Sequence, residues 1–159
     1  MGKKLKVGWF SFSCCEDSTI MFAEMLNDHF EEWSKLLEFR HARILKSKNT
    51  MEGIDVAFVE GAIAKEKDAE ELRKIRQNSK KLVAIGSCAC TGMPSAQRNL
   101  FDEKLKQEIK PIIEHFKLNE KAVPLKDVVQ VDDNVPGCPM NEEIFLQVLQ
   151  KYLKEFGVA

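Results

Sequence analysis

The chain has 159 residues, 44% of them hydrophobic and 31% charged, and a formal net charge of −1. This balance is typical of one folded globular domain and excludes a disordered chain. The nearly neutral charge argues against a general nucleic-acid binder, which needs a basic surface for phosphates. No apolar run is long enough to cross a bilayer. We therefore expect a single domain over residues 1–159, with no nucleic-acid partner and no direct membrane insertion.

Strand-like apolar runs alternate with helical periodicities along the chain. In chain order, the patterns predict a strand over 5–12, a helix from about Asp17 to Leu37, strands over 39–45 and 54–59, a helix over 65–80, a strand over 81–85, a loop over 91–99, a helix from about Asp102 that Pro111 disturbs, a short extended piece over 128–131, and a final helix over 142–155. Strands that alternate with helices predict an α/β fold, a flavodoxin-like parallel sheet with helices on both faces.

The start of the chain indicates the cellular compartment. Residues 1–6 are basic, but a strand-like run follows them without a signal-peptide cleavage pattern. Position 6 also lacks the Ser or Thr of a myristoylation signal. We therefore expect a cytoplasmic protein, whose cysteines stay reduced.

The five cysteines fall into three groups that are distant in sequence. Each group directly follows a strand-like run. Because the carboxyl ends of parallel strands share one edge of a sheet, all three groups should emerge together. In a reducing compartment, such convergence favours a metal over a disulfide. The groups are Cys14 with Cys15, Cys88 with Cys90, and Cys138 alone.

Four thiolates from three loops can hold a [4Fe–4S] cluster or a zinc ion. Zinc more often uses paired C-x-x-C knuckles, and the chain has none. For any single cysteine, a buried free thiol is the simpler interpretation. Thiol redox chemistry at Cys88-x-Cys90 or at Cys14–Cys15 is a further alternative. The set as a whole favours a cluster, because loops flanked by glycine or proline are where core residues are least expected.

Other candidate sites are weaker. Residues 86–92 lack the lysine of a phosphate-binding loop, and a flavin at the same sheet edge would leave the cysteines unexplained. The histidines His29, His41 and His115 are interpreted as surface or hydrogen-bonded core residues. From the sequence alone, Glu16 is a carboxylate at a helix start, favoured by the helix dipole. The alternative role of Glu16 is a proton relay at a partner interface.

Four ordered stretches carry a family resemblance that covers nearly the whole chain. They are Ser-Cys-Cys-Glu at 13–16, the strand and Glu-Gly turn at 55–63, the Gly-Ser-Cys-Ala loop at 84–94 with Arg98-Asn99, and residues 123–132 with Pro-Gly-Cys-Pro at 136–139. Together they resemble the small, electron-transfer subunit of nickel–iron hydrogenases and the related 20 kDa cluster-binding subunit of respiratory complex I.

The resemblance implies specific roles. Residues 1–159 would be one iron–sulfur-binding domain that holds a single proximal [4Fe–4S] cluster through Cys14, Cys15, Cys88 and Cys138. Cys90 would lie outside the ligand set, and Glu16 would match a glutamate implicated in proton movement. The chain would belong to an oxidoreductase without being catalytic by itself. It would pass electrons between a nickel–iron centre in the large-subunit partner and a downstream flavin or iron–sulfur subunit.

Two departures from the typical hydrogenase pattern leave alternatives open. The tandem Cys14–Cys15 resembles the complex I subunit, whereas typical hydrogenases have C-x-x-C. The segment 137–142 resembles the cytoplasmic hydrogenases of the sulfhydrogenase, NAD-linked or F420-linked groups more closely than the membrane-bound type. The sequence also lacks the cysteine-rich region that holds further clusters in longer small subunits. A complex I-like electron-transfer subunit without hydrogenase activity and a stand-alone cluster or thiol redox protein remain alternatives. Residues 9–12 and 93–94 are candidates for a partner surface, with a core role simpler for Trp9 and Phe10.

Overall fold

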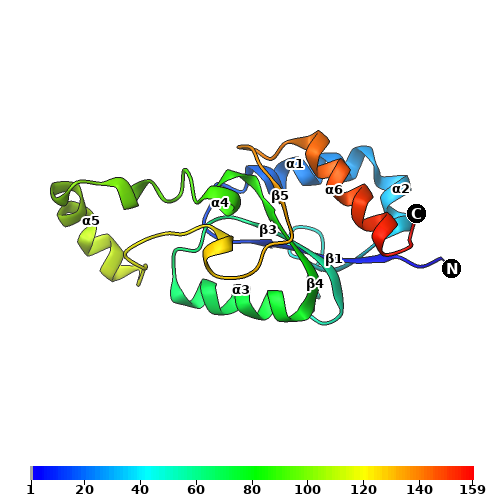
Figure 1. The fold of residues 1–159 in the computed structure, drawn as a ribbon, viewed down its shortest axis with the longest axis horizontal. Helices are drawn as coiled ribbons and strands as arrows, with labels where there is room; N and C mark the ends of the chain where they lie inside the picture. Colours follow the sequence, from blue (N-terminus) through cyan, green and yellow to red (C-terminus); the bar gives the residue numbers. More distant parts are fainter. Residues whose placement is uncertain (1) are drawn as a thin grey trace.

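The computed structural model describes residues 2–159. Its centre is a five-stranded sheet in the order β2-β1-β3-β4-β5, and every neighbouring pair is parallel (Figure 1). This order is the flavodoxin-like one, so the expected fold class is confirmed. The strands are β1 (Leu5–Ser11), β2 (Leu37–Ala42), β3 (Ile54–Glu60), β4 (Ser79–Ile85) and β5 (Asp133–Val135). The helices are α1 (Asp17–Asp28), α2 (Phe30–Leu36), α3 (Glu66–Asn78), α4 (Gly86–Thr91), α5 (Glu103–His115) and α6 (Glu142–Glu155), with 3₁₀ turns η1 (Gln97–Leu100) and η2 (Leu125–Asp127).

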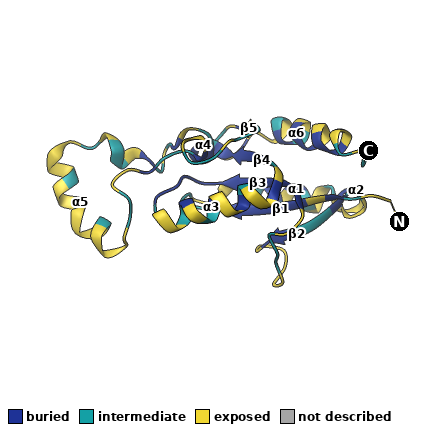
Figure 2. Cartoon of the chain, turned by 60° about the horizontal axis from the view of Figure 1, so that its bottom comes forward, coloured by how far each residue is buried: buried dark blue, intermediate teal, exposed yellow. Residues whose placement is uncertain are grey.

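The sheet separates two apolar cores, and Figure 2 shows its strands buried between helices. Alternate residues of a strand face opposite sides, so Val7 and Trp9 pack with α1, α2 and α6. Phe10 faces the opposite core, which α3, α4 and η2 cover. Every residue of β3 is buried, as expected for a central parallel strand. Trp9 and Phe10 are core residues, which confirms the simpler interpretation of both.

The prediction of one continuous helix from about Asp17 to Leu37 is wrong. The chain forms α1 and α2, and Leu37 already begins β2. The break falls at His29, whose ring stacks on Trp33 with centroids 5.0 Å apart. The break lets α2 bury Trp33 in the core, while Phe30 of the same apolar stripe is 62% exposed.

Three further expectations differ from the structure. Residues 86–91 form the short helix α4, where the sequence patterns predicted no helix. The last strand is Asp133–Val135 and not 128–131, whose valines pack as loop residues against the α3 core. Helix α5 continues through Pro111, and Asp102 caps its start by accepting a hydrogen bond from the N–H of Leu105 at 2.9 Å.

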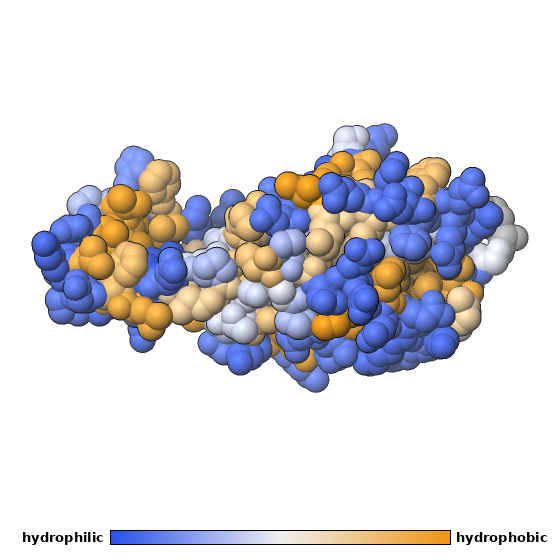
Figure 3. Space-filling model, turned by 90° about the horizontal axis from the view of Figure 1, so that it is seen from above, coloured by the Kyte–Doolittle hydropathy of each residue, from blue (hydrophilic) through white to orange (hydrophobic). Residues whose placement is uncertain are grey.

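Helix α5 extends away from the body at the end of the sheet where α4 lies (Figure 1). None of its residues is buried. Leu105, Ile112 and Phe116 follow helical spacing along one side and are exposed, with Ile112 at 54% and Phe116 at 56%. Figure 3 shows apolar residues gathered over this end of the molecule. Over residues 2–159, no helix combines the length and apolar character that crossing a membrane requires.

Candidate functional site

Four of the five cysteines line one pocket at the carboxyl edge of the sheet. Cys14 and Cys15 follow β1, Cys88 lies in α4 directly after β4, and Cys138 follows β5. This edge also contains the point between β1 and β3 where the strand order reverses, the usual ligand position in open parallel sheets. The structure therefore brings together the residues that the sequence placed in one site.

Backbone hydrogen bonds join the loops that carry these cysteines. The N–H of Ser87 donates to the carbonyl of Gly137 at 2.7 Å, and the N–H of Met140 donates to the hydroxyl of Ser18 at 3.1 Å. The N–H of Ser87 is thus engaged within the protein. Gly86 and Gly137 both adopt positive φ, and an added Cβ would lie 2.9 Å from Ser18 Oγ and 2.5 Å from Pro139 O, respectively. Only glycine allows loops this close together.

The buried glutamate of the Glu-Gly turn, to which the sequence patterns gave no role of its own, supports the first cysteine loop. Glu60 ends β3, is 3% exposed and lines the cysteine pocket. Its carboxylate accepts the N–H groups of Ser18 and Thr19 at 3.1 Å each and the hydroxyl of Thr19 at 2.6 Å. Glu60 therefore caps α1 and fixes the helix that follows Cys14 and Cys15. An acidic residue at the end of an otherwise largely apolar strand was the available signal.

The thiols of this pocket are free and differ in exposure. Cys88 is buried, Cys14 is half-buried, and Cys15 and Cys138 are exposed. Burial raises the pKa of Cys14 to about 11, and Glu60 and Cys88 add to the rise. The N–H of Asp17 lowers the pKa of Cys15, but burial, the Asp17 carboxylate and Cys138 together raise it. The thiolate forms of Cys14 and Cys15 are therefore disfavoured in this pocket. The positive charge of a bound metal group would stabilise these thiolates.

Four thiols dominate the donor set of this pocket, and thiolates are the usual ligands of iron–sulfur clusters. Within residues 2–159, no group of three or more His, Cys, Asp or Glu side chains is arranged to hold one metal ion. None of the three histidines lines the cysteine pocket; besides the four thiols its ionisable side chains are Asp17 and Glu60, and the Glu60 carboxylate already accepts three hydrogen bonds. A cube spreads its terminal thiolates over its four corners, whereas a tetrahedral zinc draws them close together. The residues present therefore fit a [4Fe–4S] group.

Cys90 lies apart from the other four cysteines. It packs against the core under α3, and its thiol donates to the carbonyl of Ala84 at 3.6 Å. Burial raises its pKa to about 11. The side chain is that of a packed, protonated thiol.

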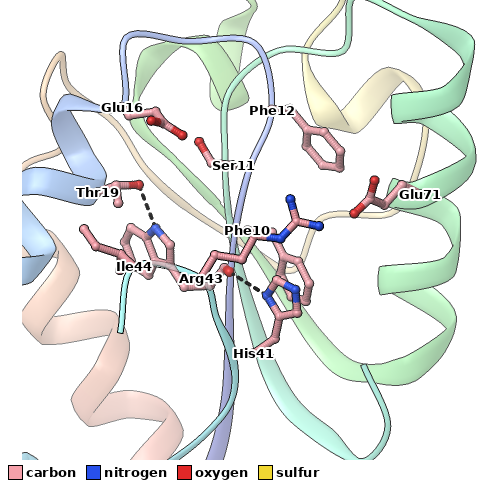
Figure 4. A pocket seen from close by; sticks show the side chains of 10 residues that line it. Phe10, Ser11, Phe12, Glu16, Thr19, His41, Arg43, Ile44 and Glu71 are labelled. Carbon is pink, nitrogen blue, oxygen red and sulfur yellow. Dashed lines mark hydrogen bonds between the residues drawn. The ribbon is translucent and has the colours of Figure 1, made fainter. Parts of the chain in front are cut away.

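Glu16 occupies the N-cap position of α1 in a left-handed conformation, with φ of 63°. The expected position of Glu16 at a helix start is confirmed, but its carboxylate makes no capping hydrogen bond, and the carboxylate of Glu60 accepts the N–H groups of α1 instead. The side chain instead lines a neighbouring pocket with Ser11 and Arg43 (Figure 4). Ser11 Oγ lies 3.6 Å from Cys14 Sγ, so this second pocket adjoins the cysteine site.

Residues 14–152 match the protein family described as NADH ubiquinone oxidoreductase, 20 Kd subunit. The chain belongs to this family. The matched region contains every cysteine of the chain.

Proteins similar to this chain include subunits of hydrogenases. The chain is 33% identical over 150 residues to sulfhydrogenase 2 subunit delta of Pyrococcus furiosus, covering 91% of this chain and 60% of that protein. It is 36% identical over 149 residues to a subunit of the F420-non-reducing vhu hydrogenase of Methanocaldococcus jannaschii, covering 85% of this chain and 51% of that protein. The chain thus spans about half or somewhat more of the length of these relatives.

The fold also matches solved structures. A chain in the crystal structure of NAD⁺-reducing [NiFe]-hydrogenase in the H₂-reduced state superimposes with a TM-score of 0.80 at 25% identity. The match covers 96% of this chain and 93% of that chain. The likeness therefore extends over the sheet, its helices and the α5 region together.

Proposed function

We propose that this chain is the small, electron-transfer subunit of a cytoplasmic nickel–iron hydrogenase. It would hold one proximal [4Fe–4S] cluster through Cys14, Cys15, Cys88 and Cys138, and the nickel–iron centre would lie in a large-subunit partner. The observation that carries the proposal is the gathering of these cysteines at one sheet edge in a chain whose relatives are hydrogenase subunits.

The protein would control the cluster through its own residues. Such a cluster accepts and releases one electron at a time, at a potential set by burial, charge and hydrogen bonds to sulfur. Cys88 is buried on the protein side, whereas Cys15 and Cys138 are exposed. This gradient supports a cluster with one side in the protein and one side toward a partner. Electrons would leave to a downstream flavin or iron–sulfur subunit.

The exposed face of α5 supports an obligate partner. A helix of 13 residues gains little stability in water unless its apolar face is packed, and α5 buries none of its residues within the chain. Ile112 and Phe116 are about half exposed, so covering them would contribute about half of the value for full burial, roughly 0.8–1.5 kcal/mol each. We assign this face to the large-subunit interface, together with Met93 and Pro94.

Glu16 is proposed as a proton relay beside the cluster. Its carboxylate is exposed, makes no capping bond and shares a pocket with Ser11, whose hydroxyl lies 3.6 Å from Cys14 Sγ. The variant Glu16→Gln should slow hydrogen-dependent turnover while leaving the iron content of the chain unchanged. Equal turnover in the variant and the wild type would end this assignment.

A second candidate follows from the family itself, whose description refers to an NADH–ubiquinone oxidoreductase. In this alternative the chain carries electrons in a complex I-like module without hydrogenase activity. Tandem Cys14–Cys15 favours it.

Anaerobic purification of the chain with its partner tests the proposal. About four irons and four sulfides per chain, nickel in the complex and hydrogen-dependent dye reduction are expected. A complex that contains the iron and sulfide of the cluster, but no nickel and no hydrogen-dependent dye reduction, would favour the complex I-like alternative. Stoichiometric zinc, with no iron or sulfide, would contradict both.

A further inference from the structure

The hydroxyl of Ser95 contacts two of the segments that carry the cysteines. Ser95 Oγ donates to the carbonyl of Ser13 at 2.8 Å and lies 3.2 Å from Sγ of Cys88, also in donor geometry. Ser13 directly precedes the Cys14–Cys15 pair. We propose that Ser95 is a positioning residue of the cysteine site, which orients the sulfur of Cys88 and tunes the reduction potential of the cluster. The inference rests on the proposed cluster.

The backbone around Ser95 is held in place, so its hydroxyl has a defined position. The N–H of Ala96 donates to the carbonyl of Gly92 at 2.7 Å, which closes a turn around Ser95. Gly92 has a positive φ, and an added Cβ there would lie 3.2 Å from the Cβ of buried Ala96. The turn therefore fixes Ser95 between the β1 loop and α4.

The single proton of the hydroxyl has two acceptors to choose between. The carbonyl of Ser13 also accepts the N–H of Ala62 at 3.0 Å, so it remains hydrogen-bonded whichever way Ser95 points. A neutral thiol is a weak acceptor, whereas a metal-bound thiolate carries negative charge and accepts more strongly. The hydroxyl is therefore expected to turn from Ser13 toward Cys88 when the site is loaded.

A donor to the sulfur has a predictable effect on the potential. Reduction adds negative charge to the cluster and its thiolates, and a hydrogen bond stabilises the more negative state more strongly. Removing the donor should therefore make the midpoint potential more negative. A change of up to about tenfold in the reduction equilibrium corresponds to about 59 mV for a one-electron couple.

The test is an anaerobic redox titration, followed by electron paramagnetic resonance, on the full chain reconstituted with iron and sulfide. Ser95→Ala should shift the midpoint negatively, and Ser95→Thr, which keeps the hydroxyl, should restore it. Thr91→Val is the matched control, because the Thr91 hydroxyl donates to the backbone carbonyl of Ser87 at 2.8 Å. An unchanged midpoint in Ser95→Ala, or an equal shift in Thr91→Val, would overturn the inference.

Two further measurements separate folding and cluster loading from tuning. If Ser95→Ala does not fold, the pair Ser95→Val and Ser95→Thr takes its place, because these side chains have the same shape and differ in the hydroxyl. A more negative midpoint in the valine variant alone supports the inference, and equal midpoints overturn it. Iron and sulfide in the wild type are measured first. Their absence would refute the proposed function, whereas a loaded Ser95→Ala with the wild-type midpoint would refute the role of Ser95 alone.

Discussion

Replacing Glu60 by glutamine should destabilise the fold by removing the cap of α1. The Glu60 carboxylate accepts two backbone N–H groups at 3.1 Å and one hydroxyl at 2.6 Å. A glutamine has a single acceptor oxygen, and its NH₂ group would face a donor. One N–H of the nearly inaccessible Ser18 or Thr19 would thus lose its partner, at a cost of about 1–3 kcal/mol. The lost charge at a helix N-terminus costs roughly 0.3–1 kcal/mol more.

The expected decrease in the free energy of unfolding of Glu60→Gln is therefore about 1.3–4 kcal/mol. Urea unfolding can measure it through the fluorescence of Trp9, whose indole N–H donates to Thr19 Oγ1 at 2.8 Å. At a slope of about 2 kcal/mol/M, the midpoint should fall by about 0.7–2 M. Glu16→Gln is the matched control, because this exposed neighbour makes no cap bond, and its change should stay within about 0.5 kcal/mol. Equal midpoints for the two variants would refute the assignment of Glu60 as the cap.

Three further predictions concern the cysteines, the α5 face and acid stability. Cys88→Ala should lower the iron content of the reconstituted chain, whereas Cys90→Ala should keep it, because Cys90 packs in the core. Ile112→Arg should leave the free energy of unfolding of the free chain within about 0.5 kcal/mol of wild type. It should weaken partner binding about tenfold or more, as measured by titration calorimetry. Asp133→Asn should make the free energy of unfolding depend less on pH in acid. Burial alone would raise the pKa of Asp133, but hydrogen bonds from Lys151 and Tyr152 hold this pKa below its ordinary value of 3.8.

Each of these predictions has a contrasting outcome. Iron loss in Cys90→Ala equal to that in Cys88→Ala would place Cys90 in the site. Gln107→Arg, on the opposite side of α5, should bind the partner normally, and an equal defect there would argue against the apolar face. Because the pKa of Asp133 is lowered in the folded chain, its contribution is present above 3.8 and is lost as the pH falls through the folded value. Acid unfolding curves of equal shape for the wild type and Asp133→Asn would contradict this coupling.

The sequence predicted the sheet and the convergence of the cysteines because both follow from local patterns. Strand 54–60 is apolar except at Asp55 and Glu60, and cysteines placed after parallel strands must meet at one edge. The sequence pattern did not predict the features that depend on contacts between residues distant in the chain. The stripe containing Phe30 and Trp33 has one helical period, but only Trp33 reaches the core once the chain breaks at His29.

The polar supports of the site were not predictable from spacing. Glu60 lies 42 residues along the chain from Ser18, whose N–H it accepts, and Ser95 lies 82 residues from Ser13. Neither pairing leaves a periodic signal, because each depends on how separate loops close over the sheet edge. A carboxylate beside the first cysteine pair instead suggested Glu16 as the cap, and the positive φ at that position turns its side chain toward a different pocket.

X-ray absorption at the iron edge of the anaerobically reconstituted chain tests the central claim most directly. A [4Fe–4S] group held by Cys14, Cys15, Cys88 and Cys138 predicts an all-sulfur first shell around iron and an iron–iron distance typical of a cube. Nitrogen or oxygen ligands in the first shell, or iron without a neighbouring iron, would contradict the account.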